Sequence, residues 1–216
     1  MRIIAYIDGF NLYHAIDDIG KPDPRRPASA TARRPHLKWL NLWTLCESFA
    51  RQGEVLEGVN YFSAFATWRE AHKRHIEYVK ALEHAGVNCI MGHFKSKAQK
   101  CRNCGATWTQ HEEKETDVHI ASRIVFDAFE ERYDRMILIT ADSDLAPALN
   151  LVKYKFPMKQ IFVVAPPGRH GHARSLNPSY TLTPGRLERH LLPPALYDAH
   201  GRLVASRPAS YAPPIV

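Results

Sequence analysis

The sequence has no apolar run long enough to cross a membrane and only 4 cysteines among its 216 residues. Residues 136–139, a strongly apolar stretch, are followed at once by polar residues, whereas a membrane-spanning helix needs about 20 apolar residues. Residues 1–8 are too short an apolar stretch, and acquire charge too early, to be a signal peptide. Cysteines in a chain without an export signal are typically reduced thiols or metal ligands. We therefore expect a cytoplasmic protein with no membrane partner.

The sequence also lacks an internal repeat, a glycine-rich phosphate loop and a Ser/His/Asp order of the kind that hydrolases use. Hydrophobic residues make up 45% of the chain and charged residues 24%, which are ordinary values for a globular protein. The length of 216 residues suits one core with a small appendage. Its net charge of +7 favours a polyanionic partner and is less specific for a membrane surface.

Short apolar segments alternate with longer amphipathic ones along the first three quarters of the chain. Such alternation predicts an α/β fold in which helices cover both faces of a mostly parallel sheet. The predicted strands are residues 2–7, 55–65, 88–93, 135–140 and 160–164, and the predicted helices are residues 37–50, 68–84, 115–130 and 145–154.

Three segments interrupt this alternation. Residues 21–35 are rich in proline and arginine and are expected to form a mobile basic loop. Residues 95–113 carry a Cys-x-x-Cys pair and are expected to be an inserted loop. Residues 193–216 are rich in proline and are expected to be an extended or disordered tail. The predicted organisation is thus one domain over residues 1–192, with the 95–113 insertion, and a C-terminal tail.

Four aspartates mark the ends of predicted strands and the start of a helix. Asp8 ends the first strand, Asp142 and Asp144 follow the strand at 135–140, and Asp117 lies near the start of the helix predicted at 115–130. Each alone is explained as a helix cap or as an acidic first turn. Together they favour a site, because the carboxyl ends of parallel strands converge on one crevice. Carboxylates gathered there would repel one another without a divalent cation, which points to hydrolytic phosphodiester chemistry.

Three motifs resemble those of NYN domains, the LabA-like group of PIN-like nucleases. They are YIDGFNLY at residues 6–13, EKETDV at 113–118 and TADSDLAP at 140–147. The resemblance covers roughly residues 1–164, with the motifs in the family's order. It implies a PIN-like Rossmannoid three-layer fold and a divalent-metal-dependent ribonuclease site.

By this resemblance, Asp8, Asp117, Asp142 and Asp144 would hold Mg²⁺ or Mn²⁺. Asn11 would position a metal-bound water or a phosphate oxygen, although a turn or cap role suits it equally. The function expected is endoribonuclease cleavage. The alternatives are an inactive nucleic-acid-binding or adaptor protein, and a non-nuclease enzyme such as an aromatic-ring hydroxylase, since pyridine-ring hydroxylation occurs among relatives.

Cys101 and Cys104 have the spacing of half a zinc site. His93 and His111 flank the pair and are the predicted remaining ligands of a structural Zn²⁺, with His119 or a cysteine of another chain as alternatives. The plain alternative is two reduced thiols in a loop. Zinc is favoured because a long loop with few apolar side chains cannot be ordered by hydrophobic packing and needs a bound metal or a similar constraint.

Basic and aromatic residues near the predicted site favour single-stranded RNA as the partner, because such proteins combine phosphate attraction with base stacking. Nothing in the sequence identifies a residue that would recognise the 2′-hydroxyl, so DNA is an alternative to RNA as the partner. A homo-oligomer is also an open alternative. A solvated surface role is the alternative for each basic residue. The predicted nucleic-acid-binding residues are Lys114, Arg102, Trp108, Arg25, Arg26, Arg33, Arg34, Arg169 and Arg174.

Overall fold

A computed structural model describes residues 1–22, 31–65, 68–101 and 103–214. Its centre is a seven-stranded sheet in the order β4-β3-β2-β1-β5-β6-β7. Every neighbouring pair from β3 to β7 is parallel, and β4 alone is antiparallel. The strands are β1 (Arg2–Asp8), β2 (Val55–Ala64), β3 (Asn88–Lys100), β4 (Thr107–Lys114), β5 (Arg135–Ile139), β6 (Gln160–Ala165) and β7 (Tyr180–Thr181).

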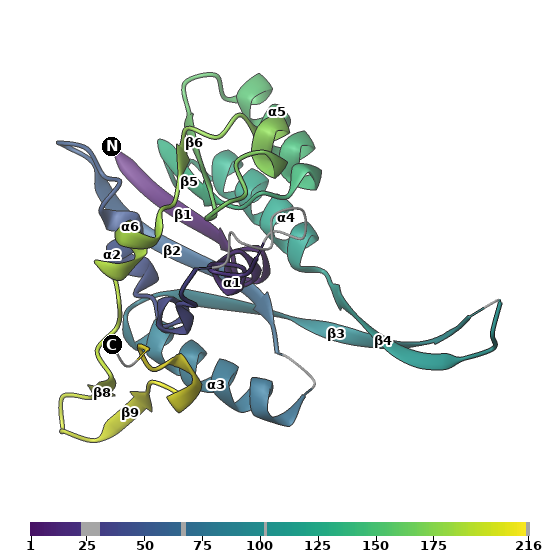
Figure 1. Ribbon diagram of the computed structural model, residues 1–216. Helices are drawn as coiled ribbons and strands as arrows, with labels where there is room; N and C mark the ends of the chain where they lie inside the picture. The colour runs from purple at the N-terminus through teal and green to yellow at the C-terminus, as the bar shows by residue number, and fades with distance from the viewer. Residues whose placement is uncertain (23–30, 66–67, 102, 215–216) are drawn as a thin grey trace.

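Helices cover both faces of this sheet, which confirms the α/β prediction (Figure 1). Alternate residues of a strand point to opposite faces. Ile3 and Ile7 accordingly enter the core beneath α1, α2 and α3, whereas Ile4 and Tyr6 enter the core beneath α4 and α5. The helices are α1 (Gly9–Asp17), α2 (Leu42–Glu47), α3 (Arg69–His84), α4 (Thr116–Phe129) and α5 (Ala146–Lys155).

The order of the strands creates a switch point between β1 and β5. From β1 the chain builds outward through β2 and β3, and it then crosses to the other side of β1 to add β5 and β6. In parallel sheets the loops that leave such a point diverge to opposite faces and open a crevice at the carboxyl ends of the strands. Asp8 ends β1, and Asp142 follows β5. Strands β1 and β5 pair directly, which places the two aspartates at neighbouring strand ends.

The predicted inserted loop at residues 95–113 is instead most of a long β-hairpin. Strand β3 continues to Lys100, and β4 pairs with it from His93↔Lys114 to Lys100↔Thr107. The hairpin projects well away from the body of the protein (Figure 1). Backbone hydrogen bonds between the two strands supply the order for which a bound metal was predicted. The zinc-knuckle insertion is therefore not part of the observed fold.

The predicted helix at residues 37–50 is broken in two. A 3-10 turn at Pro35–Lys38 precedes α2. The break lies at Asn41, whose side-chain Oδ1 accepts a 3.1 Å hydrogen bond from the Thr44 N–H and so caps a new helix.

The C-terminal segment, expected to be extended or disordered, is ordered over its described part. After α6 (Pro184–Glu188) the chain forms an antiparallel pair of β8 (Ala195–Tyr197) and β9 (Leu203–Ser206), then a 3-10 turn at Ala209–Tyr211. Leu196 and Tyr211 are buried against Trp39 and Ala81. The prolines lie between these elements, so they do not prevent packing. Within the described ranges, no helix is long and apolar enough to cross a membrane.

Candidate metal centre

Asp8 is both the last residue of β1 and the cap of α1. Its Oδ1 accepts a 2.9 Å hydrogen bond from the Asn11 N–H. Because strand residues alternate between faces, Asp8 shares the face of Ile4 and Tyr6, which is the face covered by α4. Its side chain is buried at the edge of the sheet. The carboxylate is therefore fixed in place before any ligand arrives.

Thr140 connects Asp8 to the neighbouring strand. Its hydroxyl donates to Asp8 Oδ2 at 2.8 Å and accepts from the Asp142 N–H at 3.0 Å. Thr140 is fully buried, and sequence reasoning did not assign it a role. The signal available was its position at the end of an apolar strand, two residues before Asp142. Its hydroxyl therefore links the motif at residues 6–13 to the motif at residues 140–147 and fixes Asp8 and Asp142 relative to each other.

Asp142 caps the 3-10 turn Ser143–Leu145, and its Oδ1 accepts a 2.9 Å hydrogen bond from the Asp144 N–H. Asp117 arrives from the opposite direction, in the first turn of α4. Glu115, with a φ of 76°, turns the chain from β4 into that helix. Two strand ends and one helix start thus converge on the crevice.

The side chains of Asp8, Asp117 and Asp142 each offer a carboxylate oxygen, and these three oxygens lie within 4.8 Å of one another. Burial raises the pKa of Asp117, and the negative charges of Asp142 and Asp144 raise it further. Neither Asp117 nor Asp142 forms an ion pair within the part of the chain that the structure describes. An all-oxygen donor set under mutual repulsion fits a hard divalent cation such as Mg²⁺ or Mn²⁺.

Asp144, the fourth predicted ligand, is exposed and lies outside this group of three. It is still near enough to raise the pKa of Asp117. Its backbone N–H orients Asp142, while Asp144 itself is exposed.

Asn11 has a buried side-chain Oδ1 with no hydrogen-bond partner among the described residues. A buried acceptor without a partner costs about 1–3 kcal/mol. Asn11 lies one helical turn from Asp8, to which it donates its backbone N–H. An acceptor left open at this point suits the predicted role of positioning a bound water.

The predicted zinc ligands are not brought together. Cys101 and Cys104 lie near each other at the end of the hairpin, where hydrogen bonds from the backbone of Cys104 and Asn103 lower the pKa of the Cys101 thiol. At about 3.3 Å per residue, the strand from His93 to Cys101 spans roughly 26 Å. The backbone of His111 lies opposite Ser96, roughly 16 Å from Cys101 by the same spacing. The hairpin therefore separates these two histidines from the two cysteines.

Three of the predicted RNA-binding arginines are in surface ion pairs. Arg33 contacts Asp17, Arg34 lies 2.5 Å from Glu188, and Arg169 contacts Asp18. Arg174 is exposed. Arg25, Arg26 and Arg102 lie outside the described residues, as do the side chains of Trp108, Lys114 and His111.

Comparison with known proteins gives three findings. The family model of the NYN domain matches residues 2–177. A 6-hydroxy-3-succinoylpyridine 3-monooxygenase of Pseudomonas putida is 27% identical over 201 residues, which cover 82% of this chain and 62% of that protein. The chain therefore spans less than two thirds of that relative. A solved structure of a protein of unknown function from Vibrio parahaemolyticus is similar in fold, with a TM-score of 0.50, 15% identity and coverage of 88% of this chain and 96% of that one.

Proposed function

The chain belongs to the NYN-domain family, and on that premise we propose that it is a divalent-metal-dependent endoribonuclease. NYN domains are a PIN-like nuclease family. The observation that carries the proposal is the convergence of Asp8, Asp117 and Asp142, whose carboxylate oxygens lie within 4.8 Å of one another. They meet at the switch point of a parallel sheet, where ligands bind in folds of this kind.

Asp8, Asp117 and Asp142 would hold Mg²⁺ or Mn²⁺ in this site. A divalent ion supplies charge neutralisation at a phosphodiester and makes a bound water acidic enough to act as a nucleophile near neutral pH. The contribution of the protein is to hold the carboxylate ligands in position. Asp8 is fixed by hydrogen bonds from Asn11 and Thr140, so it loses little freedom when a ligand binds.

Two polar groups beside this cluster would act on the attacking water. The open Oδ1 of Asn11 would accept a hydrogen bond from the attacking water and orient it. The exposed carboxylate of Asp144 would accept the proton that this water releases.

RNA is the proposed partner because the chain carries a net charge of +7 even though its site is acidic. The remaining surface must therefore be more basic than the total suggests. A polyanion bound through such a surface releases counterions, so its affinity falls steeply with salt.

A second candidate is oxygenation of an aromatic ring, favoured by the 27% identity to a pyridine monooxygenase. Non-catalytic binding of nucleic acid is the third. The three candidates differ in what the acidic cluster does, because only a nuclease uses it to break a phosphodiester bond.

The test is incubation of the purified chain with end-labelled single-stranded RNA in Mn²⁺, with matched samples in EDTA. We expect internal cleavage that requires the metal. Salt-sensitive binding without cleavage would contradict the nuclease and favour a binding protein. Turnover of 6-hydroxy-3-succinoylpyridine with no RNA cleavage would favour the monooxygenase. Single-stranded DNA and double-stranded RNA in parallel samples define the substrate class.

A further inference from the structure

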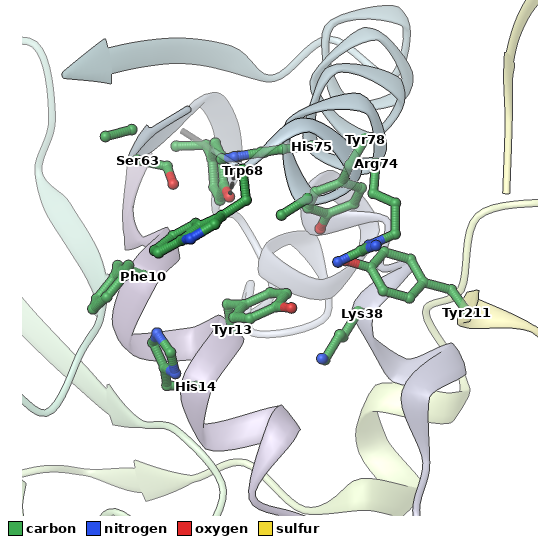
Figure 2. Close-up of a pocket in the computed structure, with 14 residues that line it drawn as sticks. Phe10, Tyr13, His14, Lys38, Ser63, Trp68, Arg74, His75, Tyr78 and Tyr211 are labelled. Carbon is green, nitrogen blue, oxygen red and sulfur yellow. Dashed lines mark hydrogen bonds between the residues drawn. The ribbon is translucent and has the colours of Figure 1, made fainter. Parts of the chain in front are cut away.

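A pocket of about 180 Å³ lies beside the acidic cluster, between α1, the end of β2, α3 and the C-terminal 3-10 turn. Its walls are mainly aromatic. Figure 2 shows the rings of Phe10, Trp68 and Tyr13 toward one end, and Arg74 beside Tyr211 toward the other. None of the predicted catalytic residues lines it. The lining residues used below are Phe10, Tyr13, Trp68, Arg74, His75 and Tyr211.

The pocket and the acidic cluster share one edge of the sheet. Gly9, in the pocket wall, directly follows Asp8. Ser63, also in the wall, directly follows Phe62, which pairs with Asp8 across the sheet. Alternation along the strands places Asp8 on the α4 face and Ser63 on the face covered by α1 and α3. A ligand that lies across this edge of the sheet can therefore contact the pocket and the acidic cluster at once.

Gly9 makes this wall possible. A Cβ at this position would lie 2.3 Å from the Tyr61 ring, a distance that no side chain tolerates. The first turn of α1 can pack directly on Tyr61 only because residue 9 has no side chain.

Arg74 supplies a positive charge at one end of the pocket. Its guanidinium lies beside Tyr211 (Figure 2), and no carboxylate pairs with it in the described ranges of the chain. Lys38, the other cation in the wall, is already paired with Asp17 and lies 4.2 Å from the centre of the Tyr13 ring. A half-buried guanidinium without an acidic partner suits an anionic group on a ligand.

The remaining wall is uncharged at neutral pH. Burial lowers the pKa of His75 to about 4, and its Nε2 lies 3.3 Å from the Tyr61 hydroxyl. The pocket therefore offers rings and neutral polar groups along most of its length and one unpaired cation at the end. A planar ring with an anionic group matches this distribution.

We propose that this pocket binds one pyrimidine nucleotide of the substrate, with the base among Phe10, Tyr13 and Trp68 and a phosphate at Arg74. The choice of RNA as its source rests on the proposed nuclease function. The volume favours one ring, because a cavity of about 150 Å³ accepts a single benzene. Stacking on an aromatic side chain strengthens binding of a base by about 1–3 kcal/mol, which is roughly 5- to 150-fold.

The test measures binding of uridine 5′-monophosphate by calorimetry in EDTA, so that no metal chemistry contributes. We expect binding that weakens at least about tenfold in Trp68→Ala and in Arg74→Gln. Trp68 is 56% exposed, so its removal leaves the core intact. Lys73→Gln is the matched control, because Lys73 lies on the same helix, is exposed and is absent from the pocket.

Four results would overturn the proposal: no binding of the nucleotide, equal binding by Arg74→Gln, equal binding by Trp68→Ala, or tighter binding of adenosine 5′-monophosphate. Tighter binding of pyridine-3-carboxylate would overturn RNA as the source and assign the pocket to a free heteroaromatic acid. The nuclease proposal can fail independently of the pocket. In that case the protein would bind the nucleotide in EDTA but would cleave no RNA with Mn²⁺.

Discussion

Asp142→Asn is expected to reduce Mn²⁺-dependent RNA cleavage by at least about a hundredfold, because it removes one of three charges that share the cation. The asparagine keeps an Oδ1 that can accept the Asp144 N–H, so the turn Ser143–Leu145 should keep its cap. The loss would therefore report on metal chemistry and not on folding. Initial cleavage rates at saturating Mn²⁺, with the melting temperature of each metal-free protein, measure the two effects separately.

Glu57→Gln is the matched control for this variant. It also removes one carboxylate, from an exposed residue of β2 near the opposite end of the sheet. Its cleavage rate should equal that of the wild type. If Asp142→Asn cleaved RNA as fast as Glu57→Gln, the activity would belong to another site or to a contaminating nuclease.

Mn²⁺ is expected to raise the melting temperature of the wild type by about 5–11 °C at a hundred times its dissociation constant. Binding at that ratio stabilises the folded state by about 2.7 kcal/mol, and each kcal/mol corresponds to about 2–4 °C in a chain of this size. Asp117→Asn should lose most of this shift, because it removes a ligand. Thermal unfolding with and without Mn²⁺ measures both proteins under one set of conditions.

Asp117→Asn should also melt at a higher temperature than the wild type when no metal is present. Burial and the charges of Asp142 and Asp144 raise the pKa of Asp117 in the folded protein. Its contribution to stability is therefore fully present below the unfolded pKa of about 3.9 and is lost as the pH rises through the higher folded value. At neutral pH the ionised carboxylate is a penalty, which the amide removes.

The pH dependence of the wild type follows from the same shift. As the pH falls toward the raised pKa of Asp117, protons compete with the metal for this carboxylate. The increase in melting temperature caused by Mn²⁺ should shrink accordingly.

An undiminished Mn²⁺ shift of the melting temperature in Asp117→Asn would show that the ion binds elsewhere.

The acidic site was accessible from sequence because its members mark element ends. Asp8 and Asp142 each follow an apolar strand, and parallel strands bring their carboxyl ends to one edge. Asp117 was placed through its motif, since an acidic first turn is by itself ordinary. Thr140 was missed because a buried threonine at a strand end is common, and only the three-dimensional register shows that it bridges Asp8 and Asp142.

The hairpin and the tail were mispredicted for a shared physical reason. Strand pairing and tertiary packing gave order to segments whose composition suggested little. Residues 95–113 contain few apolar side chains but pair along their backbones. The C-terminal segment is rich in proline, yet Leu196 and Tyr211 bury their side chains on Trp39. The aromatic pocket could not be foreseen for this reason, since one of its walls is Tyr211.

The most direct measurement is anomalous diffraction from a crystal soaked in Mn²⁺. The account predicts one strong peak coordinated by carboxylate oxygens of Asp8, Asp117 and Asp142, and its disappearance in Asp142→Asn. Mn²⁺ at full occupancy elsewhere, with these three side chains uncoordinated, would contradict the shared cation and the nuclease proposal with it.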